Sequence, residues 1–211
     1  IAPRIADETR EQLLLRLDLP ANRLLVGVVA VLDPRKGHMV LLEALLRLKR
    51  ANQDHLIPFI IIEGSGEMWQ AIADFVEKNS LAGDVRLVGN ESNIFSFMNA
   101  MDVIALPSVS HEDFPNVVLE AMSLGKAVIA TRLAGIPEQI EHLESGILVE
   151  PGDVGGLADA LQIAAEDPAL LARIGNAAQR RFTEQFTAVA AVSGYLSLYR
   201  NLMHEKEGKS G

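Results

Sequence analysis

The fold is decided by the stretch Val103–Thr131, which reads VIALPSVSHEDFPNVVLEAMSLGKAVIAT. It opens with a short apolar run at Val103–Leu106 and closes with a second one at Val128–Ala130. Between these runs, apolar residues at 118, 119 and 122 recur at helical spacing. Short apolar runs bounded by Gly, Pro or Ser are typical of parallel strands that are buried on both faces. The stretch therefore predicts two parallel strands joined by a helix.

The same alternation continues on both sides of this stretch. Four more apolar runs are predicted strands: Leu24–Val31, Phe59–Ile62, Val85–Val88 and Ile147–Val149. Segments of helical periodicity, such as 40–48 and 68–76, separate them, and after Asp153 the pattern is helical through Leu202. We predict an α/β fold: a Rossmann-like, doubly wound parallel sheet of about six strands, with helices on both faces and a helical C-terminus.

The length of 211 residues fits one compact domain with a substantial core. Within residues 1–211 we predict a polar lead segment at 1–20, a terminal helix at 187–204 and a frayed tail at 205–211. The first residue is Ile, and nothing like a signal peptide precedes the fold. We therefore expect the chain to be a fragment or a processed product.

Charge and composition exclude several classes of function. The net charge is -9 and there is no Lys/Arg cluster, so nucleic acid is not an expected partner, although a nucleotide diphosphate needs only one or two cations. There is no Cys, and the five His residues are scattered without a metal-ligand pattern, so no metal site is expected. The longest apolar runs are too short to span a bilayer, and we expect a cytoplasmic protein.

In a doubly wound sheet, ligands bind beyond the carboxyl ends of the strands. The first of these strand exits carries Lys36 and Gly37 just before a predicted helix. A Lys beside a helix N-terminus can neutralise a phosphate that the backbone N–H groups already attract. The alternative is a solvated turn in which Gly37 supplies flexibility.

The second exit carries Gly64 and Gly66, which would let a nucleotide or another loop approach the backbone closely. A tight strand-to-helix turn explains the two glycines equally well. The third glycine of a dinucleotide-binding fingerprint is absent and Trp69 lies near its place, so NAD is not predicted.

The fourth exit places two carboxylates near one helix N-terminus. Glu112 lies in the loop, Pro115 fits the first turn of the helix, and Glu120 follows just after that turn. A carboxylate can accept hydrogen bonds from two vicinal hydroxyls, which a ribose or a hexose presents. The alternatives are a solvated loop acid for Glu112 and a surface helix residue for Glu120. At the fifth exit, Glu138 fits the first turn of a helix as a structural acid.

Taken in order, these motifs resemble the C-terminal domain of the retaining family 4 glycosyltransferases, which have the two-domain GT-B architecture. The resemblance covers the chain from about Leu24 to the last helices. The matching features are Lys36-Gly37, Gly64-Ser65-Gly66, Val88-Gly89, Asp102, Pro107-Ser108, Glu112 and Glu120 with seven residues between them, Gly125, Gly135-Ile136-Pro137-Glu138 and Gly146-Ile147-Leu148-Val149.

The resemblance implies a binding site for a nucleotide-diphosphate sugar of the UDP, GDP or ADP type. It implies that Lys36 and Glu112 are catalytic, with Lys36 on the diphosphate, Glu112 on the donor sugar and Glu120 on the ribose hydroxyls. It implies no cofactor and no metal in the pocket. The donor-binding residues that it implies are Lys36, Gly37, Gly64, Gly66, Gly89, Asn90, Glu112, Phe114, Pro115, Asn116, Val117 and Glu120.

In one respect the chain departs from the family pattern. Ala30 and Val31 stand where the family has Gly-Arg, and the family Arg helps to bind the diphosphate. Either Arg35 or Arg132 substitutes for it, or donor affinity and turnover are lowered. The family also has an N-terminal acceptor domain, which this chain lacks, so we expect the chain alone to bind a donor without efficient transfer. Peripheral contact with a membrane would come through that missing half.

Three functions remain open from the sequence. The first is a hexosyltransferase that acts on a lipid, glycan or small-molecule acceptor in cell-envelope or exopolysaccharide synthesis. The second is an inactive nucleotide-sugar-binding homologue, for which Val31 is the best support. The third is a sugar-nucleotide 2-epimerase or a phosphorylase of the same architecture, which the run EDFPNVVLEAM disfavours.

Overall fold

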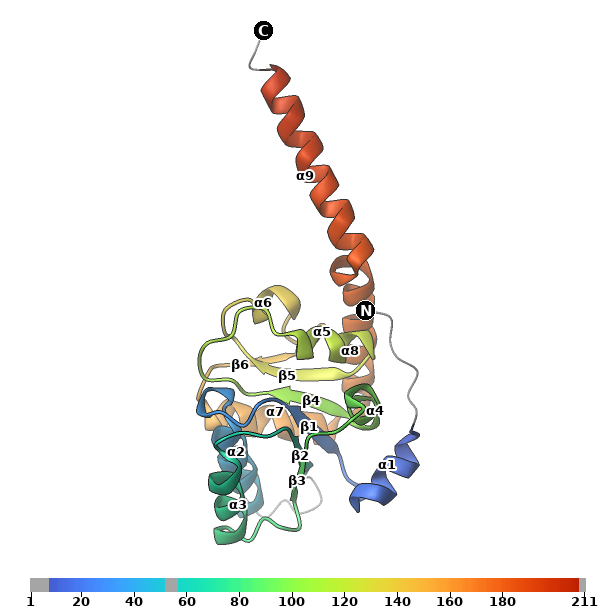
Figure 1. Cartoon of the computed structure of the whole chain (residues 1–211). Coiled ribbons are helices and arrows are strands. Elements are labelled where there is room, and N and C mark those ends of the chain that lie inside the picture. Colours follow the sequence, from blue (N-terminus) through green and yellow to red (C-terminus); the bar gives the residue numbers. More distant parts are fainter. Residues whose placement is uncertain (1–7, 52–56, 209–211) are drawn as a thin grey trace.

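The computed structural model describes residues 8–51 and 57–208. Its centre is one sheet of six parallel strands (Figure 1). The strands are β1 (Leu25–Val29), β2 (Phe59–Glu63), β3 (Val85–Gly89), β4 (Val103–Leu106), β5 (Ala127–Thr131) and β6 (Ile147–Val149). Each coincides with a predicted strand to within one or two residues at either end. The predicted fold class is thereby confirmed.

The strand order is β3-β2-β1-β4-β5-β6. From β1 the chain first adds strands on one side, through β2 to β3, and then returns to β4 and adds strands on the other side. The two central strands pair through Val26 with Val103 and Gly27 with Ile104. The order thus reverses between β1 and β4, and the helices that follow these two strands lie on opposite faces of the sheet. Such a switch point is the usual ligand crevice of a doubly wound fold.

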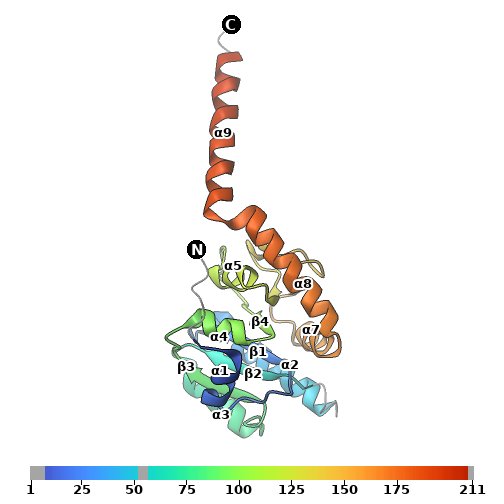
Figure 2. The same cartoon turned by 90° about the vertical axis from the view of Figure 1, so that its right-hand side faces the viewer.

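Helices cover both faces of the sheet, as predicted (Figures 1 and 2). Alternate strand residues point to opposite faces, and each face has its own apolar core. One core includes residues of α2 (His38–Arg50), α3 (Trp69–Lys78) and α7 (Val154–Glu166). The other includes residues of α1 (Arg10–Leu17), α4 (Ile94–Ala100), α5 (Asn116–Ser123) and the short α6 (Ile136–Gln139). A single 3₁₀ turn, η1 (Pro34–Lys36), precedes α2.

The lead segment contains a helix that the sequence analysis did not predict. Helix α1 begins with a capping box, in which Thr9 and Gln12 satisfy each other's backbone N–H groups. Its Leu13 and Leu14 are buried in the core that α4 and α5 share. Only two core residues in eight positions make a weak periodic signal, so the capping box was the better clue. Residues 1–7 of the predicted lead lie outside the described residues.

The C-terminal part is helical, as predicted. Helix α7 is followed by α8 (Pro168–Arg181), a π-helical turn η3 (Phe182–Phe186) and α9 (Ala188–Gly208). Helix α9 leaves the sheet and projects away from the rest of the structure (Figures 1 and 2). It extends four residues into the predicted tail, whose last residues, 209–211, lie outside the described residues.

Candidate functional site

The loops that leave β1 and β4 lie against each other at the switch point. The Val109 N–H donates to the Arg35 carbonyl at 2.8 Å. A Cβ atom added to Gly37 would lie 1.9 Å from the Pro107 carbonyl oxygen, and Gly37 has a φ of +71°. Only glycine allows this close approach without strain. Gly37 therefore has a structural role here, which is to let the two loops meet.

This contact brings together the two residues that the sequence singled out as catalytic. Lys36 Nζ and Glu112 Oε1 form an ion pair, and both side chains are largely buried, with 14% and 6% of their surface exposed. The Ser108 hydroxyl donates to the same Glu112 oxygen at 2.6 Å. Ser108 is held in turn, because its carbonyl accepts a 2.7 Å hydrogen bond from the Thr131 hydroxyl. Glu112 is therefore a fixed, buried carboxylate and not a solvated loop acid.

The loop around Glu112 is also anchored from the β1 side. Arg35 donates to the His111 carbonyl at 3.0 Å while it pairs with Asp33. His111 itself adopts a φ of +54°. Arg132, by contrast, pairs with Glu150 at the exits of β5 and β6. Of the two arginines that could replace the family Arg, Arg35 is the one that lies next to the Lys36–Glu112 pair. Val31, which stands in the place of the family Arg, is 60% exposed.

Helix α5 starts at Asn116, four residues after Glu112. Its N-cap is Pro115, and no side chain caps the backbone N–H groups of its first turn. The residues that the resemblance assigned to the backbone approach, Phe114, Pro115, Asn116 and Val117, form this start. The first N–H groups of a helix need a partner, and an anion is a favourable one. The side chain of Phe114 is 41% exposed.

Glu120 lies one turn further along α5, in a cavity that neither Lys36 nor Glu112 lines. It lines a small cavity of about 40 Å³ together with the side chains of Asn116, Leu119, Ser123, Phe182 and Phe186. Burial raises the pKa of its carboxyl group above the usual value. The two phenylalanines of η3, which lie beside Glu120 although they are more than 60 positions away in the chain, were not predicted from the sequence.

The glycines of the β2 exit support the loop-packing alternative. A Cβ atom on Gly64 would lie 2.0 Å from the Ala30 carbonyl oxygen, and one on Gly66 would lie 2.4 Å from that of Leu32. Both glycines therefore let the β2 exit pack on the β1 exit. Gly89 differs, because a Cβ atom there would have no neighbour within 4 Å. The adjacent Asn90 donates to the Ser65 hydroxyl at 3.2 Å.

Two buried titratable residues near these exits escaped the sequence analysis. Glu63, at the end of β2, accepts the Glu91 N–H at 3.0 Å, and burial raises the pKa of its carboxyl group. His38, the first residue of α2, is 1% exposed. Its burial, with a smaller effect of Lys36, lowers its pKa to about 4, so His38 is neutral at pH 7. Glu63 ends an apolar strand and His38 starts a helix, and neither position carries a sequence motif that predicts a buried titratable side chain.

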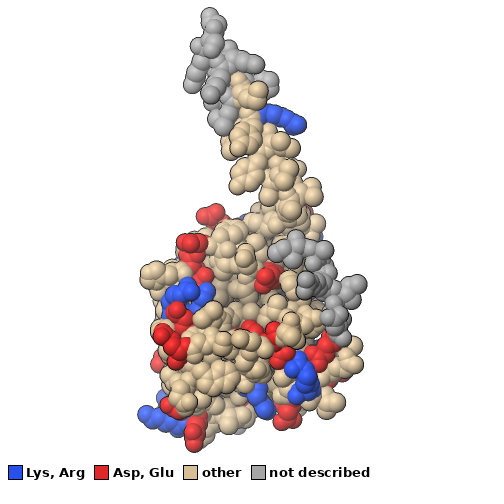
Figure 3. Space-filling view, in the orientation of Figure 1, with Lys and Arg blue, Asp and Glu red and all other residues tan. Residues whose placement is uncertain are grey.

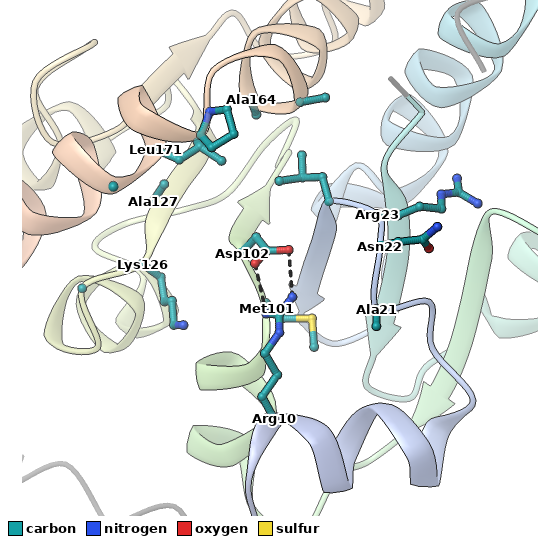
Figure 4. A pocket seen from close by; sticks show the side chains of 15 residues that line it. Arg10, Ala21, Asn22, Arg23, Met101, Asp102, Lys126, Ala127, Ala164 and Leu171 are labelled. Carbon is teal, nitrogen blue, oxygen red and sulfur yellow. Dashed lines mark hydrogen bonds and ion pairs between the residues drawn. The ribbon is translucent and has the colours of Figure 1, made fainter. Parts of the chain in front are cut away.

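A larger cavity, of about 560 Å³, lies at the opposite edge of the sheet (Figure 4). It is lined by residues at the starts of β1, β4 and β5, by Arg10 of α1 and by residues of α7 and α8. Its Arg10 and Lys126 donate to the last carbonyls of α4, those of Ala100 and Asn99. Arg10 also pairs with Asp102. Cations at a helix C-terminus are stabilising, so both side chains already have structural roles.

In residues 8–51 and 57–208, no group of three or more His, Asp or Glu side chains is arranged to hold a metal ion. No helix in these ranges has the length and apolar character to cross a membrane.

Known proteins resemble this chain in sequence. N-acetyl-alpha-D-glucosaminyl L-malate synthase of Bacillus anthracis is 32% identical over 151 residues, which are 71% of this chain and 39% of that protein. Lipopolysaccharide core biosynthesis glycosyltransferase LpsE of Rhizobium meliloti is 30% identical over 183 residues, which are 87% of this chain and 52% of that protein. The chain thus spans about half the length of the relatives that it matches, or less.

Solved structures resemble it in fold. Alr3699/HepE of Anabaena, solved in complex with UDP, is 28% identical with a TM-score of 0.79, over 89% of this chain and 52% of that one. The C-terminal domain of the glycosyl transferase group 1 family protein LpcC of Francisella tularensis is 25% identical with a TM-score of 0.73, over 86% of this chain and 94% of that one. The profile of the family described as "Glycosyl transferases group 1" matches residues 10–181. Because this match covers most of the chain, the chain belongs to the group 1 glycosyltransferase family.

Proposed function

We propose that this chain is the donor-binding half of a retaining glycosyltransferase. The whole protein would transfer a hexose from a nucleotide-diphosphate sugar to a lipid, glycan or small-molecule acceptor in cell-envelope or exopolysaccharide synthesis. The observation that carries the proposal is the buried Lys36–Glu112 pair beside the uncapped start of α5. A cation, a carboxylate and free backbone N–H groups are the groups that a phosphorylated sugar needs.

The diphosphate of the donor would bind between Lys36 and the start of α5. The N–H groups of Asn116 and Val117 have no side-chain cap, and the dipole of α5 favours a negative charge there. When the bond between sugar and phosphate breaks, negative charge grows on the leaving diphosphate. Lys36 and the helix dipole would stabilise that charge, which lowers the barrier of the reaction.

Glu112 would bind the donor sugar. Its Oε1 atom already accepts hydrogen bonds from Lys36 and Ser108, and a carboxylate has further lone pairs that sugar hydroxyls can use. Because Lys36 and Ser108 both hold Oε1, the carboxylate costs little to order when the sugar binds. Lys36 would then contact both Glu112 and the diphosphate, and so place the sugar relative to the leaving group.

The remaining donor contacts extend from this centre. Glu120 would accept the two ribose hydroxyls, and Gly89 and Asn90 at the β3 exit would flank the base. Gly64 and Gly66 would act indirectly, because they pack the β2 exit on the β1 exit. Arg35 would supply the second cation in place of the arginine that Val31 replaces.

We propose that the transfer needs neither a metal nor another cofactor. Lys36, Arg35 and the start of α5 offer positive charge where the diphosphate would lie, which is the task that a divalent cation performs in other phosphate sites. The nucleotide sugar would then be the small-molecule partner of this half. Contacts to the base at Gly89 and Asn90 would decide whether that nucleotide is of the UDP, GDP or ADP type.

The acceptor would bind to an N-terminal domain of a longer protein, which packs on α9. Apolar side chains spaced by three and four residues form a largely exposed stripe on α9, at Val189, Val192, Leu196, Tyr199 and Met203. The part of α9 that Figure 3 draws in colour is mostly tan, the colour of residues other than Lys, Arg, Asp and Glu. Such a stripe fits burial against another part of the protein. We place the whole protein in the cytoplasm, with any contact to the inner face of a membrane made by the missing half.

One observation favours a second function, that of a nucleotide-sugar-binding homologue without activity. Val31 offers an exposed apolar side chain where the family has its arginine. If Arg35 does not replace that arginine, the donor would bind weakly and transfer would be lost. The two functions differ in turnover of the full-length protein and share the same binding site.

Calorimetric titration of this chain with UDP, GDP and ADP tests the proposal. We expect saturable binding of one nucleotide, weakened about tenfold to a hundredfold in Lys36→Ala, since a charge-assisted hydrogen bond contributes about 1.5–3 kcal/mol. Lys126→Ala is the matched control, because this half-buried lysine lies at the opposite edge of the sheet. Equal losses in both variants, or no loss in Lys36→Ala, would contradict the assignment.

A further inference from the structure

Gln139 is a fully buried residue of α6 whose side chain contacts the start of α5. Its Nε2 group donates to the Pro115 carbonyl at 3.1 Å, and its exposed fraction is 0%. The orientation of the amide is settled by its partner, because a carbonyl oxygen only accepts and the NH₂ group must face it. Pro115 is the N-cap of α5, and the same carbonyl accepts the Val118 N–H at 3.2 Å.

The oxygen atom of this amide lacks a hydrogen bond. Among the residues that the structure describes, the Gln139 Oε1 atom is buried and has no hydrogen-bond partner. A buried polar atom without a partner lowers the stability of a protein, and an apolar side chain of similar size would avoid that cost. The stability of the fold alone therefore does not account for a glutamine at this position.

Neighbouring contacts show what the amide is part of. The Gly135 N–H donates to the Asp113 carbonyl at 2.8 Å. A Cβ atom on Gly135 would lie 2.4 Å from the same oxygen. The α6 segment itself is tied to the end of α8, because Arg181 donates to the carbonyls of Gln139 and Glu138, each at 2.9 Å. Gly135 and Gln139, at the start and the end of α6, thus fix the loop that follows Glu112 through its Asp113 and Pro115 carbonyls.

We propose that Gln139 is a positioning residue that holds the first turn of α5 in place of an N-cap side chain. A Ser, Thr, Asp or Asn at the N-cap would hold this turn by binding its N–H groups, and those groups would then be unavailable to a ligand. Gln139 binds the N-cap carbonyl instead and so occupies none of those N–H groups. The turn is held while the N–H groups of Asn116 and Val117 stay free for the diphosphate. The consequence for the donor rests on the proposed function, whereas the holding of the turn does not.

The test compares Gln139→Leu and Gln139→Met with wild-type protein and with Gln179→Leu. Gln179 is a suitable control because its Nε2 group donates to the Ser123 carbonyl, at the other end of the same helix, also at 3.1 Å. Three quantities are measured: the thermal unfolding midpoint, the amide hydrogen exchange of residues 116–120 without ligand, and the affinity for the nucleotide that the wild type binds.

We expect both Gln139 variants to unfold at the same or a higher temperature than the wild type. We also expect the Val118 N–H to exchange at least tenfold faster, and the nucleotide to bind about tenfold more weakly. Gln179→Leu should leave exchange at Val118 and the affinity unchanged. Unchanged exchange at Val118 in both Gln139 variants would overturn the proposal, as would a loss of affinity that only follows a lower unfolding temperature. If the wild type binds none of the three nucleotides, the proposed function fails, and the exchange rates still decide the role of Gln139.

Discussion

Lys36 and Glu112 are 76 positions apart in the chain and form a buried ion pair at the point where the strand order reverses. The pair exists because β1 and β4 are neighbours and because Gly37 lets their exit loops touch. In the ligand-free protein, each residue neutralises the other. A donor that brings a diphosphate to Lys36 and hydroxyl groups to Glu112 would use both groups without leaving a charge unpaired.

The first prediction concerns this balance of charge. Glu112→Gln leaves Lys36 largely buried without its carboxylate, and it should lower the free energy of unfolding by about 3 kcal/mol, since breaking a buried pair costs about 3–5 kcal/mol. A nucleoside diphosphate should restore part of this loss, because its phosphates replace the missing charge. Urea unfolding with and without the nucleotide measures both effects. A variant as stable as the wild type would show that the pair carries no structural role.

The second prediction concerns the contact between the loops. Gly37→Ala places a Cβ atom against the Pro107 carbonyl and forces alanine into a positive φ. We expect a loss of at least about 2 kcal/mol, since a left-handed residue alone costs about 1–2 kcal/mol and the clash adds to it. Gly89→Ala is the control, because its φ of +72° is nearly the same and its Cβ would meet nothing within 4 Å. Denaturant unfolding of both variants should show the larger loss in Gly37→Ala, and equal losses would contradict the close contact.

The third prediction separates stability from binding at Glu120. Burial raises the pKa of this carboxyl group in the folded protein, so the folded state binds its proton more tightly than the unfolded chain does. The charged form therefore lowers stability once the pH rises above the usual Glu pKa of about 4.3. Glu120→Gln should be more stable than the wild type at pH 7 and lose that advantage below about pH 4.

The same variant should bind the nucleotide more weakly. Glu120→Ala should cost about 1–3 kcal/mol of binding free energy if the carboxylate holds both ribose hydroxyls, and Glu120→Gln should lose a large part of that. Glu138→Gln, in the first turn of α6, serves as a control for the loss of one acidic residue nearby. An unchanged affinity in both Glu120 variants would refute the ribose assignment, whatever happens to stability.

The fourth prediction follows from the buried His38. Its pKa is lowered to about 4, so below pH 6.5 the unfolded chain binds a proton that the folded protein does not. Stability should therefore fall as the pH drops from about 6.5 toward 4, by about 2 kcal/mol at pH 5, at 1.36 kcal/mol for each pH unit. His38→Gln should remove this dependence, and His111→Gln, on the exposed loop, should keep it. Urea unfolding at pH 7 and pH 5 distinguishes the two variants, and an unchanged pH dependence in His38→Gln would contradict this account.

The strands were predictable from the sequence because they are buried on both faces. Such strands are continuous apolar runs with turn residues at both ends, as in Val103–Leu106 and Ile147–Val149, and the structure changes their ends by no more than two residues. Helix α1 was missed because only Leu13 and Leu14 of its eight residues reach the core. Local patterns thus identify the elements that bury most of their surface.

The candidate site was predictable in part. Lys36, Glu112 and the start of α5 were identified by motif order, and the structure brings them together. The supporting contacts were not predictable, because they join distant segments: Thr131 with Ser108, Phe182 with Glu120, and Gln139 with Pro115. From the sequence, Gly64 and Gly66 were predicted to contact a ligand or to form a tight turn. In the structure, both let the β2 exit pack on the β1 exit. A sequence pattern does not say what a close backbone approach is for.

The central claim is that a nucleotide binds between Lys36 and the start of α5, and amide NMR shifts test it most directly. The chain is titrated with the nucleotide that calorimetry identifies, and the shifts of all backbone amides are followed. We predict the largest shifts at Gly37, Asn116 and Val117, and small shifts in Lys36→Ala at the same ligand concentration. Largest shifts at Asp102 and Lys126, which line the cavity at the opposite edge of the sheet, would place the ligand elsewhere and contradict the account.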